Sequence, residues 1–187
     1  MSAPLAIFDI DGPPTADEIQ TLASVYESIL VSELRGAPHR FAVTPGARTL
    51  LDHLFASEWD IAIATGGWSR LAHLKLAAAH IPTNLLLASC DDSQDRFEIF
   101  RLAQNRAAKR RTDSYSRIVL VGDGIWDLRV AAALGWCFLG VGKGERARRL
   151  VAEGASAVVE DFSDLSRVLN LLEHCSAPDV RESQGAG

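Results

Sequence analysis

The chain has 187 residues, which is enough for one domain with a hydrophobic core but few for two. Hydrophobic residues make up 48% of the chain and charged residues 23%, a balance typical of soluble globular proteins. The formal net charge of −5 gives no electrostatic reason to expect nucleic acid or an anionic membrane as a partner.

The N-terminus and the cysteines indicate a cytoplasmic location. The first residues lack the basic start and the apolar stretch of a signal peptide, and no run approaches the roughly 20 apolar residues that a bilayer requires. The three cysteines are scattered and show no metal-ligand spacing, which fits a reducing compartment. We therefore expect a cytoplasmic protein that does not associate with membranes.

Apolar runs that predict strands alternate with amphipathic patterns that predict helices. The first strand is expected at 5–9, followed by a segment, 13–44, that holds one helix from Ala16 to about Arg35. From there the order is helix 45–57, strand 60–64, helix 69–79, a weaker strand 85–87, helix 95–109, strand 118–122, helix 126–134, strand 136–140, helix 145–153, strand 157–159 and helix 164–173.

This alternation predicts an α/β protein: a Rossmann-like three-layer α/β/α arrangement with a mostly parallel sheet. We expect a single domain over residues 1–175, in which 13–44 is a small helical insertion after the first strand. The polar tail 176–187 is expected to be disordered.

Polar side chains follow three of the predicted strands directly. Asp9 and Asp11 end the first apolar run, Thr65 follows the second, and Asp123 and Asp127 follow the clearest one. In open α/β sheets this edge is where ligands bind. Four carboxylates gathered there would repel one another, and a hard divalent cation such as Mg²⁺ would relieve that repulsion.

The same residues suit phosphoryl transfer. One carboxylate can attack phosphorus as a nucleophile, and a second, two residues on, can act as acid and then as base. The Thr65 hydroxyl and the backbone N–H groups of the turn that contains Gly66 can hold phosphate oxygens.

These motifs resemble motifs I, II and IV of the haloacid dehalogenase-like (HAD) superfamily. They read Asp-Ile-Asp-Gly at 9–12, Thr-Gly at 65–66 and Gly-Asp-Gly-x-x-Asp at 122–127, in the order and after the strands that the family uses. The similarity covers residues 4–162. It implies a HAD-like fold and a Mg²⁺-dependent phosphatase that hydrolyses small phosphate monoesters through an aspartyl-phosphate intermediate.

The resemblance also implies a role for each motif residue. Asp9 is the nucleophile, and Asp11 is the general acid/base whose backbone carbonyl also faces Mg²⁺. Thr65 hydrogen-bonds the phosphoryl group, Asp123 ligates the metal directly or through water, and Asp127 supports the metal site from one helical turn away.

Motif III of the family is a lysine or arginine that neutralises the phosphoryl group. Arg96 stands at the expected place, early in the helix before the motif IV strand, whereas Arg101, Lys109 and Arg110 lie later on that helix. Arginine would hold two phosphate oxygens at once. The alternative is an ordinary surface arginine.

Two features depart from the family pattern. Pro13 and Pro14 follow motif I, where they stiffen the chain and remove backbone donors. The segment 13–44 is short for a cap, so we expect an open site, or a lid supplied by a neighbouring subunit of a homo-oligomer.

Other interpretations stay open. Trp68 and Trp126 either line a pocket or pack against a helix, and the basic clusters at 109–111 and 146–149 are expected to be solvated helix faces. A HAD-type phosphomutase and a non-catalytic HAD-like protein for binding or assembly are the alternative functions.

Overall fold

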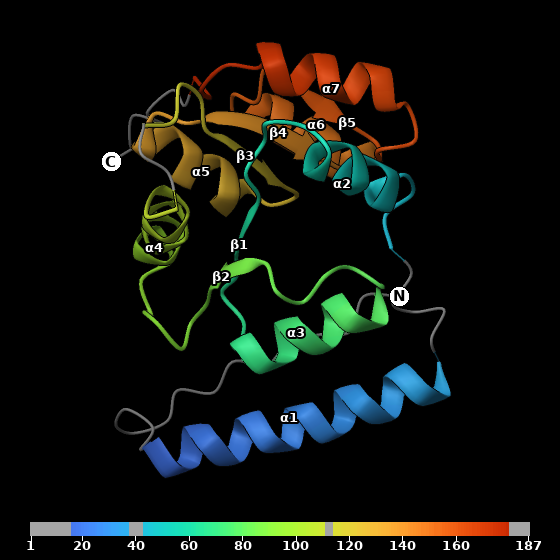
Figure 1. Cartoon of the computed structure of the whole chain (residues 1–187), viewed down its shortest axis with the longest axis vertical. Helices are drawn as coiled ribbons and strands as arrows, with labels where there is room; N and C mark the ends of the chain where they lie inside the picture. Colours follow the sequence, from blue (N-terminus) through green and yellow to red (C-terminus); the bar gives the residue numbers. More distant parts are fainter. Residues whose placement is uncertain (1–15, 38–42, 111–113, 180–187) are drawn as a thin grey trace, which may run out of the picture. The chain divides into compact units, whose positions relative to one another are not determined.

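A computed structural model gives the arrangement of the chain, described here for residues 16–37, 43–110 and 114–179 (Figure 1). The chain divides into two compact units, residues 1–41 and 42–187. Helix α1 (Ala16–Gly36) is the described part of the first unit. Among the described residues, no helix is long and apolar enough to cross a membrane.

Helix α1 confirms the helix expected from Ala16 to about Arg35 and takes up most of the segment 13–44. Four of its large apolar side chains recur three and four residues apart, which places them on one face, and each is about half exposed: Leu22, Val25, Tyr26 and Ile29. Leu30, by contrast, is buried.

The described strands of the second unit form two parallel sheets. Strand β1 (Ala62–Ala64) pairs with β2 (Leu86–Ala88). Strand β4 (Cys137–Val141) lies between β3 (Val119–Gly122) and β5 (Val158–Val159). Every strand predicted after residue 45 is present within two residues of its expected bounds. The strand predicted at 5–9 lies outside the described residues.

The helices of the second unit also match their predicted positions within two residues. They are α2 (Ala47–Phe55), α3 (Ser69–Ala78), α4 (Arg96–Ala108), α5 (Ile125–Leu134), α6 (Gly144–Ala152) and α7 (Leu165–His174). Helix α2 precedes β1, helices α3 to α6 each connect one described strand to the next, and α7 follows β5, so the parallel pairing follows from the alternation.

Helices cover both faces of the sheet formed by β3, β4 and β5 (Figure 1). On one face α2 and α7 pack against Leu139 and Val159, and on the other α5 and α6 pack against Leu120 and Phe138. Neighbouring residues of a strand serve opposite faces because successive side chains alternate. The expected three-layer α/β/α class is confirmed.

Helix α4 connects the two sheets. Ile99 and Ala103 pack with Ala88 of β2, whereas Phe100 belongs to the core that contains Leu120 of β3. Side chains on two faces of α4 therefore pack against the two sheets. This packing holds the first residues of α4 near the ends of β1 and β3.

The end of the second unit is held by hydrogen bonds. The Arg117 guanidinium donates to the carbonyls of Leu172 and Cys175, which satisfies carbonyl groups at the C-terminus of α7. Beyond the helix, Ser176 accepts from the Phe138 backbone N–H, and Asp179 donates its backbone N–H to Gly154. The expected tail from 176 thus begins within a hydrogen-bonded stretch.

Candidate active site

The second unit contains a cavity of about 810 Å³ lined by residues of β1, β3 and α4. Thr65, Gly66, Arg96, Asp123 and Asp127 all line this cavity. Residues from three separate sequence motifs thus meet in one place, at the carboxyl ends of two strands.

Asp9 and Asp11, the expected nucleophile and acid/base, lie outside the described residues. The described part of the site is therefore the half that the sequence assigns to phosphate and metal binding.

The Thr65 turn begins where β1 ends. The Thr65 backbone N–H donates to the Ala88 carbonyl at 3.0 Å, which extends the pairing with β2 by one residue. The Gly67 N–H donates to Thr65 Oγ1 at 3.1 Å, so the hydroxyl oxygen already accepts one bond and the hydroxyl hydrogen can point to a ligand. Helix α3 starts at Ser69, two residues after Gly67, so the N-terminus of the helix lies next to the Thr65 turn.

Arg96 is the first residue of α4 and lies between two motifs. Its Nη2 donates to Asp127 Oδ1 at 2.6 Å, and a Cβ on Gly66 would stand 3.3 Å from its Nη1. The guanidinium carbon lies 5.9 Å from the centre of the Phe100 ring. The helix starts at this point because Asp95 caps it, accepting from the Phe97 N–H at 2.8 Å.

Asp127 is a buried carboxylate, with 8% of its surface exposed. Its Oδ2 accepts from the Gly124 N–H at 3.1 Å, so the side chain closes the first turn of α5. Glycine is needed at 122, because a Cβ there would lie 2.6 Å from Asp127 Oδ2. A buried carboxylate requires a partner, and Arg96 supplies it.

Asp123 differs from Asp127 because its side chain is 63% exposed. Its Oδ2 accepts from Nη1 of Arg146 at 2.7 Å. Arg146 belongs to the first turns of α6, and its side chain passes Gly142 so closely that a Cβ on this glycine would lie 2.9 Å from Arg146 Cγ. Arg146, Arg148 and Arg149 are exposed, as expected for a solvated helix face, and Arg146 in addition pairs with Asp123.

Trp126 stands beside the cavity residue Asp127 and is 64% exposed. The guanidinium carbon of Arg129 lies 5.1 Å from the centre of its ring. Of the two interpretations, packing against a helix fits Trp126, whose ring lies against Arg129 of its own helix α5. Neither Trp126 nor the half-buried Trp68 is among the residues that line the cavity described above.

Two solved structures resemble this arrangement over most of the chain. A hydrolase from Pseudomonas syringae matches with a TM-score of 0.61 and 26% sequence identity, over 88% of this chain and 76% of that one. A conserved haloacid dehalogenase-like protein of unknown function from Agrobacterium tumefaciens matches with a TM-score of 0.58 and 18% identity, over 87% and 72%. The chain has the HAD-like fold. No family model matches the sequence, and neither does any curated protein.

Within this HAD-like fold, the donor set can be compared with the expected Mg²⁺ site. Asp123 and Asp127 offer hard oxygen donors, the type that Mg²⁺ takes in proteins. In the described part of the chain, no group of three or more His, Cys, Asp or Glu residues could hold a metal ion. The described carboxylates thus fit one side of such a site, and the other expected donors, Asp9 and Asp11, lie outside the described residues.

The sequence analysis did not predict the contact of Arg146 with the cavity residue Asp123. The sequence does contain a signal. Arg146 lies in the first turn of α6, directly after β4, and the parallel strands β3 and β4 end at the same edge of the sheet. The run of arginines at 146–149 concealed it, because the spacing alone does not say which of them reaches across the edge.

Proposed function

We propose that the protein is a Mg²⁺-dependent phosphomonoester hydrolase that works through an aspartyl-phosphate on Asp9. The observation that carries this proposal is Arg96, whose guanidinium lies against Gly66 and pairs with Asp127. A cation between two strand-end motifs suits a phosphoryl group, since its planar fork can hold two phosphate oxygens. The likeness to the Pseudomonas syringae hydrolase supports hydrolysis as the class of reaction.

The reaction proceeds in two displacements at phosphorus. An Asp9 carboxylate oxygen attacks, the ester P–O bond breaks, and Asp11 donates a proton to the departing alcohol oxygen. Asp11 then takes a proton from water, which attacks the phosphorus. The bond between Asp9 and phosphorus breaks, inorganic phosphate leaves, and both carboxyl groups return to their starting states. The Thr65 hydroxyl and Arg96 hold the phosphoryl oxygens throughout.

The Mg²⁺ ion belongs to the same proposal. Asp9, Asp123 and the backbone carbonyl of Asp11 would hold it, and Asp127 would support the site from the first turn of α5. When bound, the ion supplies positive charge that offsets the phosphate and the clustered carboxylates.

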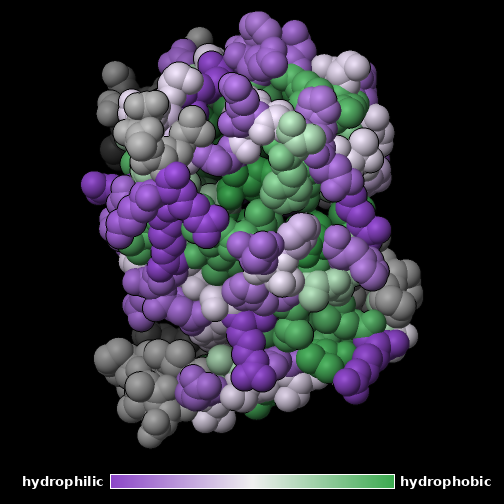
Figure 2. Space-filling view, viewed as in Figure 1, coloured by the Kyte–Doolittle hydropathy of each residue, from purple (hydrophilic) through white to green (hydrophobic). Residues whose placement is uncertain are grey.

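The proposal needs a free strand edge beside the cavity. Among the described residues, β1 and β3 each have a strand partner on one side only, and both line the cavity. Its wall combines polar and apolar groups, and Figure 2 shows hydrophobic side chains at the surface in the middle of the view, where Figure 1 places β1 and β3. The sequence predicts a strand at 5–9 that ends in Asp9, and the proposal requires this end to meet the edge that holds Thr65 and Asp123.

The substrate is a small phosphate ester under this proposal. The described part of the insertion is one helix, α1, which is little material for a closed cap. The proposal therefore keeps two versions: an open site, or a site covered by a neighbouring subunit of a homo-oligomer.

Hydrolysis of an aryl phosphate by the full chain tests the proposal, with Mg²⁺ and then with a chelator. Asp9→Asn removes the nucleophile and should abolish turnover, whereas Asp52→Asn, an exposed carboxylate of α2, should leave it unchanged. Turnover that survives Asp9→Asn, or that ignores the chelator, would refute the mechanism.

A binding function without catalysis is the second candidate. It is favoured by one observation: both described motif IV carboxylates are already paired with arginines, Asp127 with Arg96 and Asp123 with Arg146. The two candidates differ in the same assay. Beryllofluoride that binds the wild-type chain, without turnover of any phosphate ester, would favour the binding function.

A further inference from the structure

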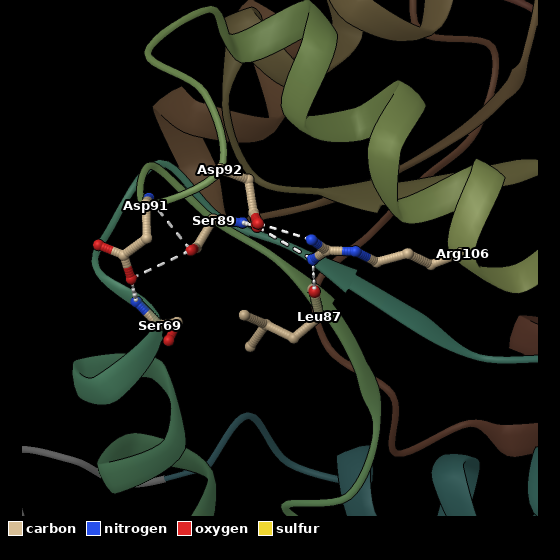
Figure 3. Close-up of polar contacts among 6 residues, drawn as sticks. All are labelled: Ser69, Leu87, Ser89, Asp91, Asp92 and Arg106. Atoms are coloured by element: carbon tan, nitrogen blue, oxygen red, sulfur yellow. Dashed lines mark hydrogen bonds and ion pairs between the residues drawn. The ribbon is translucent and has the colours of Figure 1, made fainter.

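A loop after β2 connects the Thr65 turn with helix α4. Figure 3 shows the polar contacts of this loop, in which Ser89, Asp91 and Asp92 point to different parts of the protein. Ser89 is fully buried, and its Oγ donates to Asp91 Oδ2 at 3.3 Å while accepting from the Asp91 N–H at 3.2 Å. The buried hydroxyl thereby fixes the direction of the Asp91 carboxylate.

Asp91 caps helix α3 from a distance of 22 residues. Its Oδ2 accepts from the Ser69 N–H at 2.7 Å, at the first residue of the helix. The residue at the usual capping position is Trp68, whose side chain makes no capping hydrogen bond. The first turn of a helix leaves several N–H groups without partners, and Asp91 satisfies one of them.

The same loop also holds the Thr65 turn. The Cys90 N–H donates to the Gly67 carbonyl at 3.3 Å. Ser69, which Asp91 caps, lies only two residues after Gly67 in the chain. The turn is thus fixed on one side by the β-sheet bond from Thr65 and on the other by Cys90 and Asp91. Burial and the neighbouring carboxylates raise the pKa of the Cys90 thiol, which keeps it a neutral structural residue.

Asp92 ties the loop to α4. Its two oxygens accept from the two terminal nitrogens of Arg106 at 2.5 and 3.0 Å, and Arg106 also donates to the Leu87 carbonyl (Figure 3). The Asp92 Oδ2 further accepts from the Ser89 N–H at 2.9 Å. Arg106 lies in the last turn of α4, at the opposite end of the helix from Arg96, so this contact holds the loop without touching the proposed phosphate-binding groups.

We infer that Asp91 is a positioning residue, which holds the Thr65–Gly67 turn in the geometry that receives the phosphoryl group. The inference rests on the proposed function. Asp91 acts by accepting a hydrogen bond from the Ser69 N–H. Its negative charge does not help, because a negative charge beside an anion site opposes the binding of phosphate.

Three substitutions in the full chain separate this role from plain stability. Asp91→Ala removes the acceptor, Asp91→Asn keeps an oxygen acceptor without the charge, and Asp92→Asn is the matched control in the next residue. The kcat and KM for an aryl phosphate with Mg²⁺ are measured for each, together with hydrogen exchange at the Gly67 and Ser69 amides.

Asp91→Ala should lower kcat by roughly 10- to 100-fold with a smaller change in KM, because a turn that is misplaced by about 1 Å no longer matches the transition state. The Ser69 and Gly67 amides should exchange faster. Asp91→Asn should restore both properties. Asp92→Asn should lower the Tm, since Arg106 loses its charged partner, while kcat and KM stay near the wild-type values.

Wild-type kcat in Asp91→Ala, or equal damage in Asp91→Asn, would overturn the inference. If the wild-type chain shows no turnover, the proposed function fails, and the exchange measurement still decides the positioning. Amides that stay protected in Asp91→Ala refute it, and amides that lose protection in this variant alone support it.

Discussion

At the scale of single residues, the two aspartates of the described site, Asp123 and Asp127, differ in burial and in their partners. Asp127 is buried and is held by Arg96 and by the Gly124 N–H, whereas Asp123 is exposed and meets Arg146 at the surface. The buried carboxylate cannot exchange its partner for water, so its arginine has a structural duty as well as the proposed phosphate-binding one.

Arg96→Ala should therefore lower both stability and phosphate affinity. Leaving the Asp127 carboxylate without its partner should cost about 1–2 kcal/mol of unfolding free energy, a value reduced by the partial exposure of Arg96. Arg101→Ala is the matched control, since Arg101 lies on the same helix and only approaches Glu98 at 3.8 Å. Urea unfolding and binding of inorganic phosphate measure the two effects. Equal stability of the two variants would contradict the duty assigned to Arg96.

Asp92 gives a pH-dependent prediction. The hydrogen bonds from Arg106 hold the pKa of the Asp92 carboxyl below its ordinary value. A carboxyl with a lowered pKa in the folded state contributes stability above its unfolded pKa of about 3.9, and the contribution disappears as pH falls through the lower folded value. Urea unfolding of wild type and Asp92→Asn should show a gap at pH 7 that narrows below about pH 4. A constant gap would show that the carboxylate charge does not contribute.

At the scale of elements, the segments that follow β1 and β3 are each held by a contact from a distant part of the chain. Helix α6 lends Arg146 to Asp123, and the loop after β2 lends Asp91 to the start of α3. The alternation of apolar runs predicted the strands and helices themselves, because the patterns are local. These two contacts join residues 23 and 22 positions apart, and no local pattern says which surface arginine or which of two neighbouring aspartates makes them.

The pair of Arg146 and Asp123 makes a prediction about the metal. Both side chains are more than half exposed, and exposed pairs contribute about 0.2–1 kcal/mol. If Asp123 takes part in binding Mg²⁺, Arg146 competes for its oxygen. Arg146→Ala should then tighten Mg²⁺ binding by roughly 1.4- to 5-fold in calorimetric titration of the full chain with the metal alone. Arg148→Ala is the control, because Arg148 pairs with Glu145 on its own helix. Weaker binding in Arg146→Ala would mean that the arginine supports the metal site.

At the scale of the whole molecule, the fold class followed from the sequence, and the layers confirm it. The strands β3 and β4 show why: Val119 and Leu139 contribute to the core on one face, whereas their strand neighbours Leu120 and Phe138, which pair with each other, contribute to the core on the other face. The motif residues could also be named, since they follow strands directly. The described motif residues meet in one cavity, and this could be seen only in the tertiary structure, in which α4 connects both sheets and brings Arg96 to Gly66.

The two sheets lead to the last prediction. If the run 5–9 pairs between β1 and β3, it is the central strand of one continuous sheet and each of its backbone N–H groups is needed. Ile7→Pro removes one such group and leaves its carbonyl partner unsatisfied, which should lower the unfolding free energy by about 1–3 kcal/mol and the Tm by roughly 2–12 °C for a chain of this size. Ala3→Pro, ahead of the run and beside Pro4, is the matched control and should melt like the wild type. Thermal unfolding followed by circular dichroism compares the three proteins. An unchanged Tm in Ile7→Pro would place the nucleophile of motif I outside the cavity and leave Arg96 without the partner that the proposed chemistry requires.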